Sequence, residues 1–439
     1  MSNDHTIPFR VGHWLPSDHA ILERWMAALV GEVASEKRPL LPVIEEFKKL
    51  IEQDPEIYML FHQMFSEVPR KPPYNRNPDG KPQVRSYEHM LNMLNAIMTR
   101  APEWSAAGDK SGLIGCPINA ILDWSMGTAA GFAAFLNARV NAHLKEILNE
   151  WSGFLASADS CYVLNATSDK GWFGVPALTA VAKMDPYYGT GDDPTDPTGN
   201  FVYNFKCDPS RKHWGFASWD DFFTREFNVG RRPVAAPDDD DVIVNACESA
   251  PYRLARQVGR REKFWIKAQP YSLQHMLAND ELLDHFVGGT VYQAFLSAKS
   301  YHRWHSPVSG TIVKAHVKDG AYYSETLAEG FDPSGPSESQ GYITEVATRA
   351  LIFIQPDNPK IGLMCMMPVG MAEVSSCQIK AYAGQRVKKG EQLGSFHFGG
   401  STYCLLFGPQ VQLAFDFHGQ EPGLSSSNIA VNARIATAL

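Results

Sequence analysis

The chain has 439 residues, more than one typical domain, so two domains are expected. Its composition is that of a soluble globular protein, with 44% hydrophobic and 20% charged residues. The net charge of -8 argues against a nucleic-acid partner. No apolar run approaches the roughly 20 residues that a membrane span needs. Residues 1–20 match neither a secretory nor a transit peptide, so a cytoplasmic location is expected.

The seven cysteines are widely spaced, and no two of them form a C-x-x-C pair. This spacing argues against a zinc site or a redox dithiol, so no metal site is predicted and the thiols are interpreted as structural. Two acidic segments could bind a hard cation or simply be solvated, and the sequence leaves both possibilities open. They contain Asp192, Asp193 and Asp196, and residues 238–241.

Residues 30–155 are predicted to be helical. One apolar stripe has helical spacing and is preceded by Ser86 as a candidate N-cap: Met90, Met93, Leu94, Ile97 and Met98. A second stripe follows at or near one helical face: Phe132, Leu136, Val140, Leu144, Leu148 and Trp151. Residues 71–85 and 184–212 are rich in Pro, Gly and Asp, and both are predicted to be loops, the second near a domain junction.

After about residue 240, short β-branched or apolar runs alternate with glycine turns, which is typical of strands. The runs are 242–244, 310–313, 351–354 and 361–364. The predicted fold class is therefore α+β. A helical N-terminal region spans residues 1–165, and a mainly antiparallel β domain spans residues 166–439.

Two segments of the β domain, 306–317 and 379–394, echo one another and are similar to lipoyl- and biotinyl-type half-barrels. Lipoyl-like half-barrel elements are therefore expected. A modified lysine at a hairpin tip, at Lys388 or Lys389, is an alternative, although the usual flanking acidic residue or methionine is missing.

The dipeptide Gly400-Ser401 can carry chemistry. Because glycine lacks Cβ, the Ser401 hydroxyl can approach the preceding carbonyl, and an N-to-O acyl shift would turn the peptide bond into an ester. β-Elimination would then break this ester and leave dehydroalanine, which hydrolyses to a pyruvoyl group and ammonia. A free serine is a poor nucleophile, so this attack needs a base and donors for the oxyanion. His302 and His305 can transfer protons near neutral pH, and Glu248 could orient an imidazole or be an ordinary surface acid.

Several motifs in order make the chain resemble the phosphatidylserine decarboxylase family over about residues 165–439. They lie at 218–225, 232–233, 301–310, 370–374 and 387–402. The resemblance implies autocatalytic cleavage between Gly400 and Ser401, and a pyruvoyl cofactor derived from Ser401. It also implies that the two resulting chains, 1–400 and 401–439, stay associated.

The resemblance also implies roles for three other residues. His305 matches the family's processing base, and His302 matches a histidine associated with substrate binding or protonation. Glu248 stands where the family usually has an aspartate within S-P-x-D-G, whereas this chain has A-C-E-S at 246–249. The longer acidic side chain could orient the imidazole in the same way.

The helical extension and the lack of a targeting or membrane segment are similar to the soluble fungal branch of the family, which includes mushroom tryptophan decarboxylases. The shared phrases are 46–55, 246–249, 301–305, 310–314 and 396–401. This implies a small-molecule substrate, a free aromatic L-amino acid, with L-tryptophan giving tryptamine as the leading candidate. The substrate amine would condense with the pyruvoyl ketone, which accepts electrons as CO2 leaves.

Two alternatives stay open. A phosphatidylserine decarboxylase making phosphatidylethanolamine would share the chemistry but act on membranes, and no stable membrane anchor is predicted here. A binding module that never cleaves would share only the scaffold. Four aromatic residues near the chemistry could line a pocket or belong to the core: Trp304, Phe396, Phe398 and Tyr403.

Overall fold

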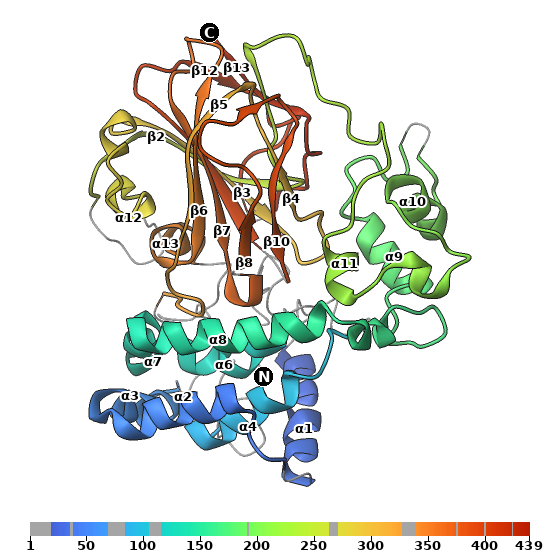
Figure 1. The fold of residues 1–439 in the computed structure, drawn as a ribbon, viewed down its shortest axis with the longest axis vertical. Helices are drawn as coiled ribbons and strands as arrows, with labels where there is room; N and C mark the ends of the chain where they lie inside the picture. The colour runs from blue at the N-terminus through green and yellow to red at the C-terminus, as the bar shows by residue number, and fades with distance from the viewer. Residues whose placement is uncertain are drawn as a thin grey trace, which may run out of the picture.

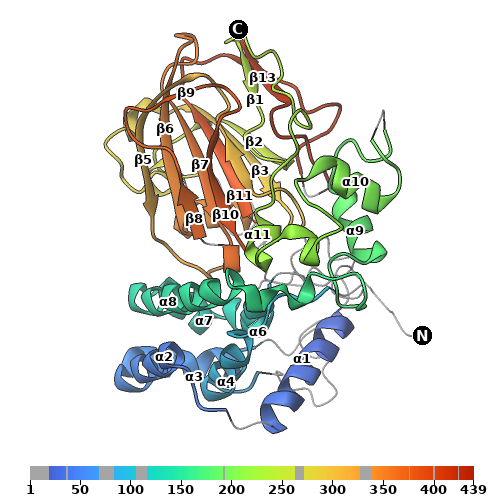
Figure 2. The same cartoon turned by 45° about the vertical axis from the view of Figure 1, so that its right-hand side comes forward.

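The computed structural model describes residues 19–35, 38–68, 84–104, 116–190, 193–262, 271–326, 339–374, 376–398, 401–423 and 425–439. Its N-terminal helices form a layer at one end of the molecule, and the strands stand on this layer with their lower ends facing α8 (Figure 1). Helices α9 to α11 lie beside the sheets. The view turned by 45° shows the same arrangement, with β7, β8, β10 and β11 ending above the helical layer (Figure 2).

The helical layer consists of α1 (His19–Ser35), α2 (Pro42–Gln53), α3 (Pro55–Ser66), α4 (Tyr87–Ile97), α6 (Pro117–Met126), α7 (Ala129–Leu136) and α8 (Ala138–Leu155). Beside the sheets lie η2 (Ala158–Val163), α9 (Val175–Ala182), α10 (Pro197–Asn204), η3 (Lys212–Gly215) and α11 (Trp219–Phe223). Shorter helices punctuate the β region: α12 (Leu273–Met276), η4 (Leu283–His285), α13 (Gln340–Val346) and η5 (Ala372–Val374).

The predicted helix around Met90 is confirmed as α4. Its N-cap is Ser86, whose Oγ accepts the His89 N–H at 3.2 Å. The predicted apolar stripe faces the core, since Met90, Met93, Leu94, Ile97 and Met98 are all at most 3% exposed.

The second apolar stripe is divided between two helices. Asn137 ends α7 and caps α8, because its Oδ1 accepts the N–H groups of Arg139 and Val140. Leu136, the last residue of α7, is 39% exposed and lies off the buried face. The stripe residues in α8 are buried as expected: Val140, Leu144, Leu148 and Trp151.

The loop predicted over residues 184–212 is wrong in part, because α10 lies within it. Asp196 caps this helix by accepting the Gly199 N–H at 2.7 Å, and Pro197 occupies its first turn, where a missing N–H costs nothing. Asp192 and most of the loop predicted at 71–85 lie outside the described residues. Within the described ranges, no group of three or more His, Cys, Asp or Glu side chains could hold a metal ion.

The strands are β1 (Val242–Val244), β2 (Ala250–Val258), β3 (Gly289–Leu296), β4 (Arg303–His305), β5 (Gly310–Lys318), β6 (Arg349–Pro356), β7 (Met364–Gly370), β8 (Ser376–Ile379), β9 (Arg386–Val387), β10 (Gln392–His397), β11 (Ser401–Phe407), β12 (Leu413–Phe415) and β13 (Arg434–Ala438). They form a seven-stranded sheet in the order β2-β3-β11-β7-β6-β5-β9 and two three-stranded sheets, β1-β13-β12 and β4-β10-β8. All these pairings are antiparallel.

The predicted α+β class is therefore confirmed, and the sheets are open. Three of the predicted strands are β1, β5 and β6. The fourth is wrong over 361–363, which form a turn with Gly362 at a φ of +60°, so β7 begins only at Met364. Helices α9 to α11 still precede the first strand after residue 165. The domain boundary proposed at 165/166 stays a prediction.

The two segments with half-barrel phrasing pair with each other, since Gly310 lies opposite Val387 in the β5–β9 pair. Lys389, one of the two candidate modified lysines, is buried beside this pair. Its Nζ donates to the carbonyls of Ala236, Asp239 and Val242 at 2.7–3.0 Å. An ammonium held by three carbonyls stabilises the local fold and is not presented to a modifying enzyme.

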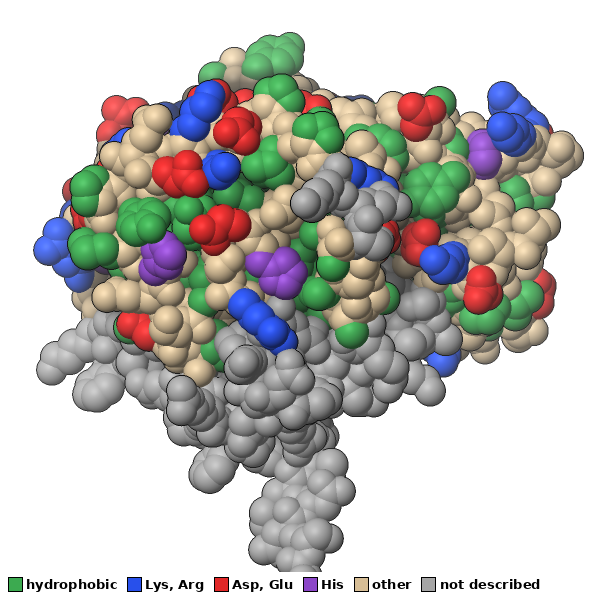
Figure 3. All heavy atoms as spheres, turned by 90° about the horizontal axis from the view of Figure 1, so that it is seen from below, with side chains coloured by type: hydrophobic (Ala, Val, Ile, Leu, Met, Phe, Trp, Pro, Cys, Tyr) green, Lys and Arg blue, Asp and Glu red, His purple; other side chains and the backbone are tan. Residues whose placement is uncertain are grey.

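Two hydrophobic cores meet where the strands end. The core of the helical layer includes residues from the β region, namely Tyr323, Ala372 and Phe398. Seen from the helical end, acidic, basic and apolar side chains are interspersed over the described surface (Figure 3). None of the described helices has the length and apolarity needed to cross a bilayer.

Candidate active site

Ser401 opens β11, the strand between β3 and β7, where it lies opposite Leu296 and Gly370. Its side chain is fully buried, and its Oγ has no hydrogen-bond partner among the described residues. A buried hydroxyl without a partner costs about 1–3 kcal/mol, so the fold tolerates an unfavourable serine here. Gly400 lies outside the described residues, and the geometry of the 400–401 bond is therefore not described.

The residue that leads into this segment has an unusual backbone. Phe398 has a φ of +61°, in the left-handed region that bulky residues rarely adopt. Its ring packs against Trp151 of α8 and Trp219 of α11, with ring centroids 5.9 and 6.4 Å apart. The helices thus hold a strained residue two positions before Gly400, and such strain is typical of functional sites.

His305 has a partner at each ring nitrogen. Its Nδ1 lies 2.8 Å from the Gly390 carbonyl, which can only accept, so Nδ1 carries the proton. Its Nε2 therefore accepts from the Tyr301 hydroxyl at 2.9 Å. Burial lowers the pKa of His305, so the ring is neutral at neutral pH and has a basic Nε2.

His302, three residues earlier and just before β4, has aromatic surroundings. Its ring stacks on Phe223 of α11 at 4.1 Å, and its carbonyl accepts the Phe396 N–H from β10 at 2.9 Å. Neither ring nitrogen makes a well-formed hydrogen bond to a described residue. Burial and then the nearby Arg225 guanidinium hold the pKa of His302 well below its usual range.

Arg225 also fixes the loop that precedes the histidines. Its guanidinium is buried, and its Nη2 donates to the carbonyl of Lys299 at 2.7 Å and to that of Ser300 at 3.3 Å. Burial lowers the pKa of Arg225 to about 10, so it remains a cation at neutral pH. This fixed positive charge disfavours a second proton on the neighbouring His302.

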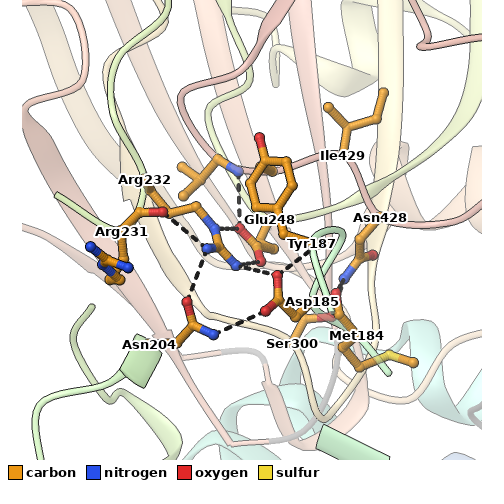
Figure 4. A network of polar contacts seen from close by, with 12 residues as sticks. Met184, Asp185, Tyr187, Asn204, Arg231, Arg232, Glu248, Ser300, Asn428 and Ile429 are labelled. Carbon is orange, nitrogen blue, oxygen red and sulfur yellow. Dashed lines mark hydrogen bonds and ion pairs between the residues drawn. The ribbon is translucent and has the colours of Figure 1, made fainter. Parts of the chain in front are cut away.

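Glu248 is buried in an ion-pair network (Figure 4). Its carboxylate accepts from Nε and Nη2 of Arg232 at 2.9 and 2.6 Å, and Val431 N–H donates to its Oε2 at 3.0 Å. Arg232 also donates to Asp185 at 2.9 Å. The acid is therefore a bidentate partner of an arginine, and its role as the orienting acid stays a prediction.

The structure brings these residues together only indirectly. Tyr301 is linked to both residues: it donates to the His305 imidazole, and the Glu248 charge is one cause that raises the pKa of Tyr301, after burial. Among the described residues, no hydrogen bond joins Glu248 to His305 or Ser401 to either histidine. The roles predicted for Ser401, His305 and Glu248 in a common reaction therefore stay predictions.

The sequence interpretation missed the functions of Tyr301 and Arg232, although both belong to its motifs. Tyr301 could have been found, because residues four apart on an extended segment share a face and Tyr301 and His305 have this spacing. Arg232 could not, since its contact with Glu248 depends on tertiary packing.

The four aromatic residues near the chemistry differ in surroundings. Trp304 and Phe396 are fully buried and pack edge to face, as core residues do. Tyr403 donates to Asn245 Oδ1 at 2.5 Å. Phe398 precedes Gly400 by two residues, and a role for it in lining a substrate pocket stays a prediction.

Comparisons with known proteins agree with this arrangement. A family model described as phosphatidylserine decarboxylase matches residues 219–425, and a second model of that description matches residues 41–181. The family likeness thus extends into the helical layer, beyond the part where the sequence motifs lie.

Three relatives cover most of the chain. Decarboxylase iboD of Amanita muscaria is 39% identical over 74% of this chain and 94% of the relative. The L-tryptophan decarboxylases of Psilocybe cubensis and Psilocybe cyanescens are 34% and 35% identical over 90% of this chain and 88% of each relative. On these matches and on the order of its motifs, the chain is a decarboxylase that belongs to the phosphatidylserine decarboxylase family.

Proposed function

We propose that the chain is a pyruvoyl-dependent decarboxylase of a free aromatic L-amino acid, with L-tryptophan as the first candidate. It would mature by breaking its own bond between Gly400 and Ser401. The observation that carries this proposal is the buried, unpartnered Ser401 hydroxyl, which follows a strained Phe398 at the start of β11. A residue that is consumed to make a cofactor needs no stable hydrogen bond of its own.

His305 is the proposed base for maturation. Its Nδ1 is committed to the Gly390 carbonyl, which leaves a lone pair on Nε2, and its lowered pKa keeps that nitrogen free of a second proton. Tyr301 occupies Nε2 before cleavage, so the imidazole would have to exchange this contact for the serine hydroxyl. Glu248 would act on His305 through Tyr301 by its charge and by fixing the surrounding segment.

The residues at 401 and 302 suit the decarboxylation step. Residue 401 would hold the pyruvoyl group, which supplies the electron sink for the loss of CO2. His302 lies between the aromatic ring of Phe223 and the strand that leads to residue 401, where water is excluded. Its neutral imidazole still carries one N–H, and we propose that this proton goes to the substrate Cα.

Substrate choice rests on the relatives. Two proteins that match about nine-tenths of this chain are named L-tryptophan decarboxylase, whereas a phosphatidylserine decarboxylase of Schizosaccharomyces pombe matches 45% of the chain at 30% identity. The alternative activity on phosphatidylserine would need a lipid-facing surface. A cytoplasmic location remains an expectation from the sequence.

The position of the short C-terminal segment supports association after cleavage. Strand β11 pairs on both sides with strands of the 1–400 segment, β3 and β7, and β13 pairs with β1. Cutting at residue 401 breaks none of these ladders. The 401–439 chain would therefore stay bound to the 1–400 chain through β11 in the seven-stranded sheet and through β13 in a three-stranded sheet.

The decisive experiment combines mass spectrometry with a product assay. Purified chain should separate into two fragments, the shorter starting with a pyruvoyl group, and should release CO2 from L-tryptophan but not from phosphatidylserine vesicles. Ser401→Ala should remain intact and inactive, while the matched Ser395→Ala, a buried serine on β10, should cleave normally. If CO2 were released from phosphatidylserine and not from L-tryptophan, the substrate would be the lipid. If the wild-type chain were active without being cut, the proposed maturation would be wrong.

A further inference from the structure

A small cavity lies where α6 meets the lower end of the seven-stranded sheet. It measures about 10 Å³, close to the space that one water molecule needs. Its lining combines helical and strand residues: Asn119, Tyr323, Ile343, Gly370, Met371 and Ala372. The cavity therefore lies at the interface between the helical layer and the β region.

The cavity is beside Ser401. Gly370, which contributes to the lining, is the direct β7 partner of Ser401 on β11. Two residues further on, Ala372 has a φ of +50°, a strained value for a residue with a Cβ. This strained turn brings Glu373 against the start of α6, where its Oε1 accepts the Asn119 N–H at 2.7 Å.

Three buried polar groups at this junction have unused hydrogen-bonding capacity. Asn119 is 1% exposed, and neither its Oδ1 nor its Nδ2 has a partner among the described residues. The same holds for the Tyr323 hydroxyl, 2% exposed, and for Oε2 of the fully buried Glu373. Burying such groups without partners is unfavourable, so a hydrogen-bonding group that entered the cavity would stabilise them.

We propose that this cavity receives the hydrogen-bonding edge of the substrate side chain, and that Asn119 and Tyr323 determine specificity by binding it. This inference rests on the proposed function. The size of the cavity suits one heteroatom group rather than a whole ring. For an indole substrate that group is the ring N–H, for which Asn119 Oδ1 is an acceptor.

The proposal explains why a decarboxylase domain should be joined to these helices. The only cavity-lining amide among the residues named above comes from α6, and Glu373 locks the start of that helix to the turn after β7. The side chain of a substrate bound at residue 401 would then be recognised by Asn119, a residue about 280 positions earlier in the chain. The helical layer would contribute specificity rather than chemistry.

The test compares L-tryptophan with 1-methyl-L-tryptophan, in which a methyl group replaces the ring N–H. The processed wild type should have a kcat/KM at least about tenfold higher for tryptophan. Asn119→Leu should lower the tryptophan value by about tenfold and leave the value for the methylated analogue within about twofold. Tyr323→Phe keeps the shape of its side chain and should act in the same direction.

Ile343→Val is the matched control, because it changes the same cavity without removing a polar atom. It should alter both substrates by the same factor. Thermal unfolding without substrate gives an independent readout: removing an amide with no partner should leave the Tm unchanged or raise it, whereas a structural amide would lower the Tm on replacement. Mass spectrometry should show normal cleavage in every variant.

Three results would overturn the inference: equal wild-type activity on both substrates, equal losses on both in Asn119→Leu, or a lowered Tm in Asn119→Leu and Tyr323→Phe. If the wild type decarboxylates no aromatic amino acid although it cleaves, the proposed substrate class fails first. The unfolding data then decide separately whether these groups are structural or belong to a ligand site.

Discussion

His302 directly precedes the short strand β4 and His305 ends it, yet their surroundings differ. Around His305 the groups are polar and each nitrogen has a partner, with the Arg232–Glu248 ion pair close behind Tyr301. Around His302 the neighbours are aromatic, and neither nitrogen forms a good hydrogen bond to a described residue. One short segment, residues 302–305, therefore presents one imidazole with a fixed tautomer and one from which water is excluded.

This difference suggests a division of labour. A base for maturation must have its lone pair on a defined nitrogen before the reaction, and hydrogen bonds achieve this for His305. A donor in decarboxylation must work in a site from which water is excluded, and aromatic packing provides that around His302. The substitutions below should therefore slow either maturation itself or, in enzyme that has already matured, decarboxylation.

The largest effect is expected for His305→Ala. Without a base at this position, cleavage should slow by about 10²–10⁴-fold, which leaves intact precursor after purification. The fraction of cut chain, followed by mass spectrometry over time, measures it. His418→Ala is the control, because His418 is exposed and remote from Ser401 in the fold. Cleavage at the wild-type rate in His305→Ala would transfer the role of base to another residue.

His302→Phe should separate the two steps. The phenyl ring can keep the stacking on Phe223, so cleavage should proceed, while kcat for decarboxylation of processed enzyme should fall by about 10²-fold or more because the donor N–H is lost. Phe223→Leu tests packing alone and should reduce kcat less. A processed His302→Phe enzyme with full turnover would remove His302 as the proton donor.

Much of the chemistry could be predicted because it is local. The step Gly400-Ser401 and the block 301–310 are contiguous in sequence, and their order identified the family before any contact was known. The fold class and α4 followed from periodicity and from Ser86 as a cap. Helix α10 was missed because Pro197 was interpreted as a breaker, whereas proline is favoured in the first helical turn.

The contacts of the site could not be predicted, because they join distant segments. Glu248 was expected to orient an imidazole. Its carboxylate instead pairs with Arg232, which also pairs with Asp185, and both of these residues come from other segments of the chain. Asn119 gave no signal at all, since one asparagine in an apolar helix has no local pattern that distinguishes a ligand-binding amide. Only the packing of α6 against the turn after β7 shows where that amide lies.

Glu248→Gln should reduce stability as well as maturation. Replacing one member of a buried, bidentate ion pair leaves Arg232 with less compensation, at a cost of about 3 kcal/mol in the free energy of unfolding. Cleavage should slow by about tenfold if Glu248 supports His305 through Tyr301. Asp416→Asn changes an exposed ion pair with Arg434 in the same way and should cost under about 1 kcal/mol. Equal losses in the free energy of unfolding for the two variants would contradict the expectation that the buried pair matters more than the exposed one.

The pH dependence of maturation should reflect the lowered pKa of His305. The base is competent when it is neutral, which holds above its pKa, and burial moves that pKa below the ordinary value. The cleavage rate should therefore stay constant from pH 8 to below pH 6.5 and decline only in more acidic buffer. Rates measured on freshly refolded precursor test this expectation, and a midpoint at or above the ordinary histidine value would contradict it.

The smallest effect on the cleavage rate is expected for Tyr301→Phe, which tests the polar surroundings of His305 directly. The hydroxyl donates to Nε2 and so stabilises the neutral imidazole; without it a second proton binds more easily, and the pKa of His305 should rise. The acidic limb of the cleavage profile should shift to higher pH, while the rate above that limb changes by only a few-fold, because Nε2 no longer has to exchange one hydroxyl for another. Tyr403→Phe, which removes a buried hydroxyl bonded to Asn245 instead, should leave the midpoint in place. A shift toward lower pH in Tyr301→Phe would mean that the Tyr301–His305 contact stabilises the imidazolium, and that the polar side of this strand is arranged for donating rather than accepting a proton.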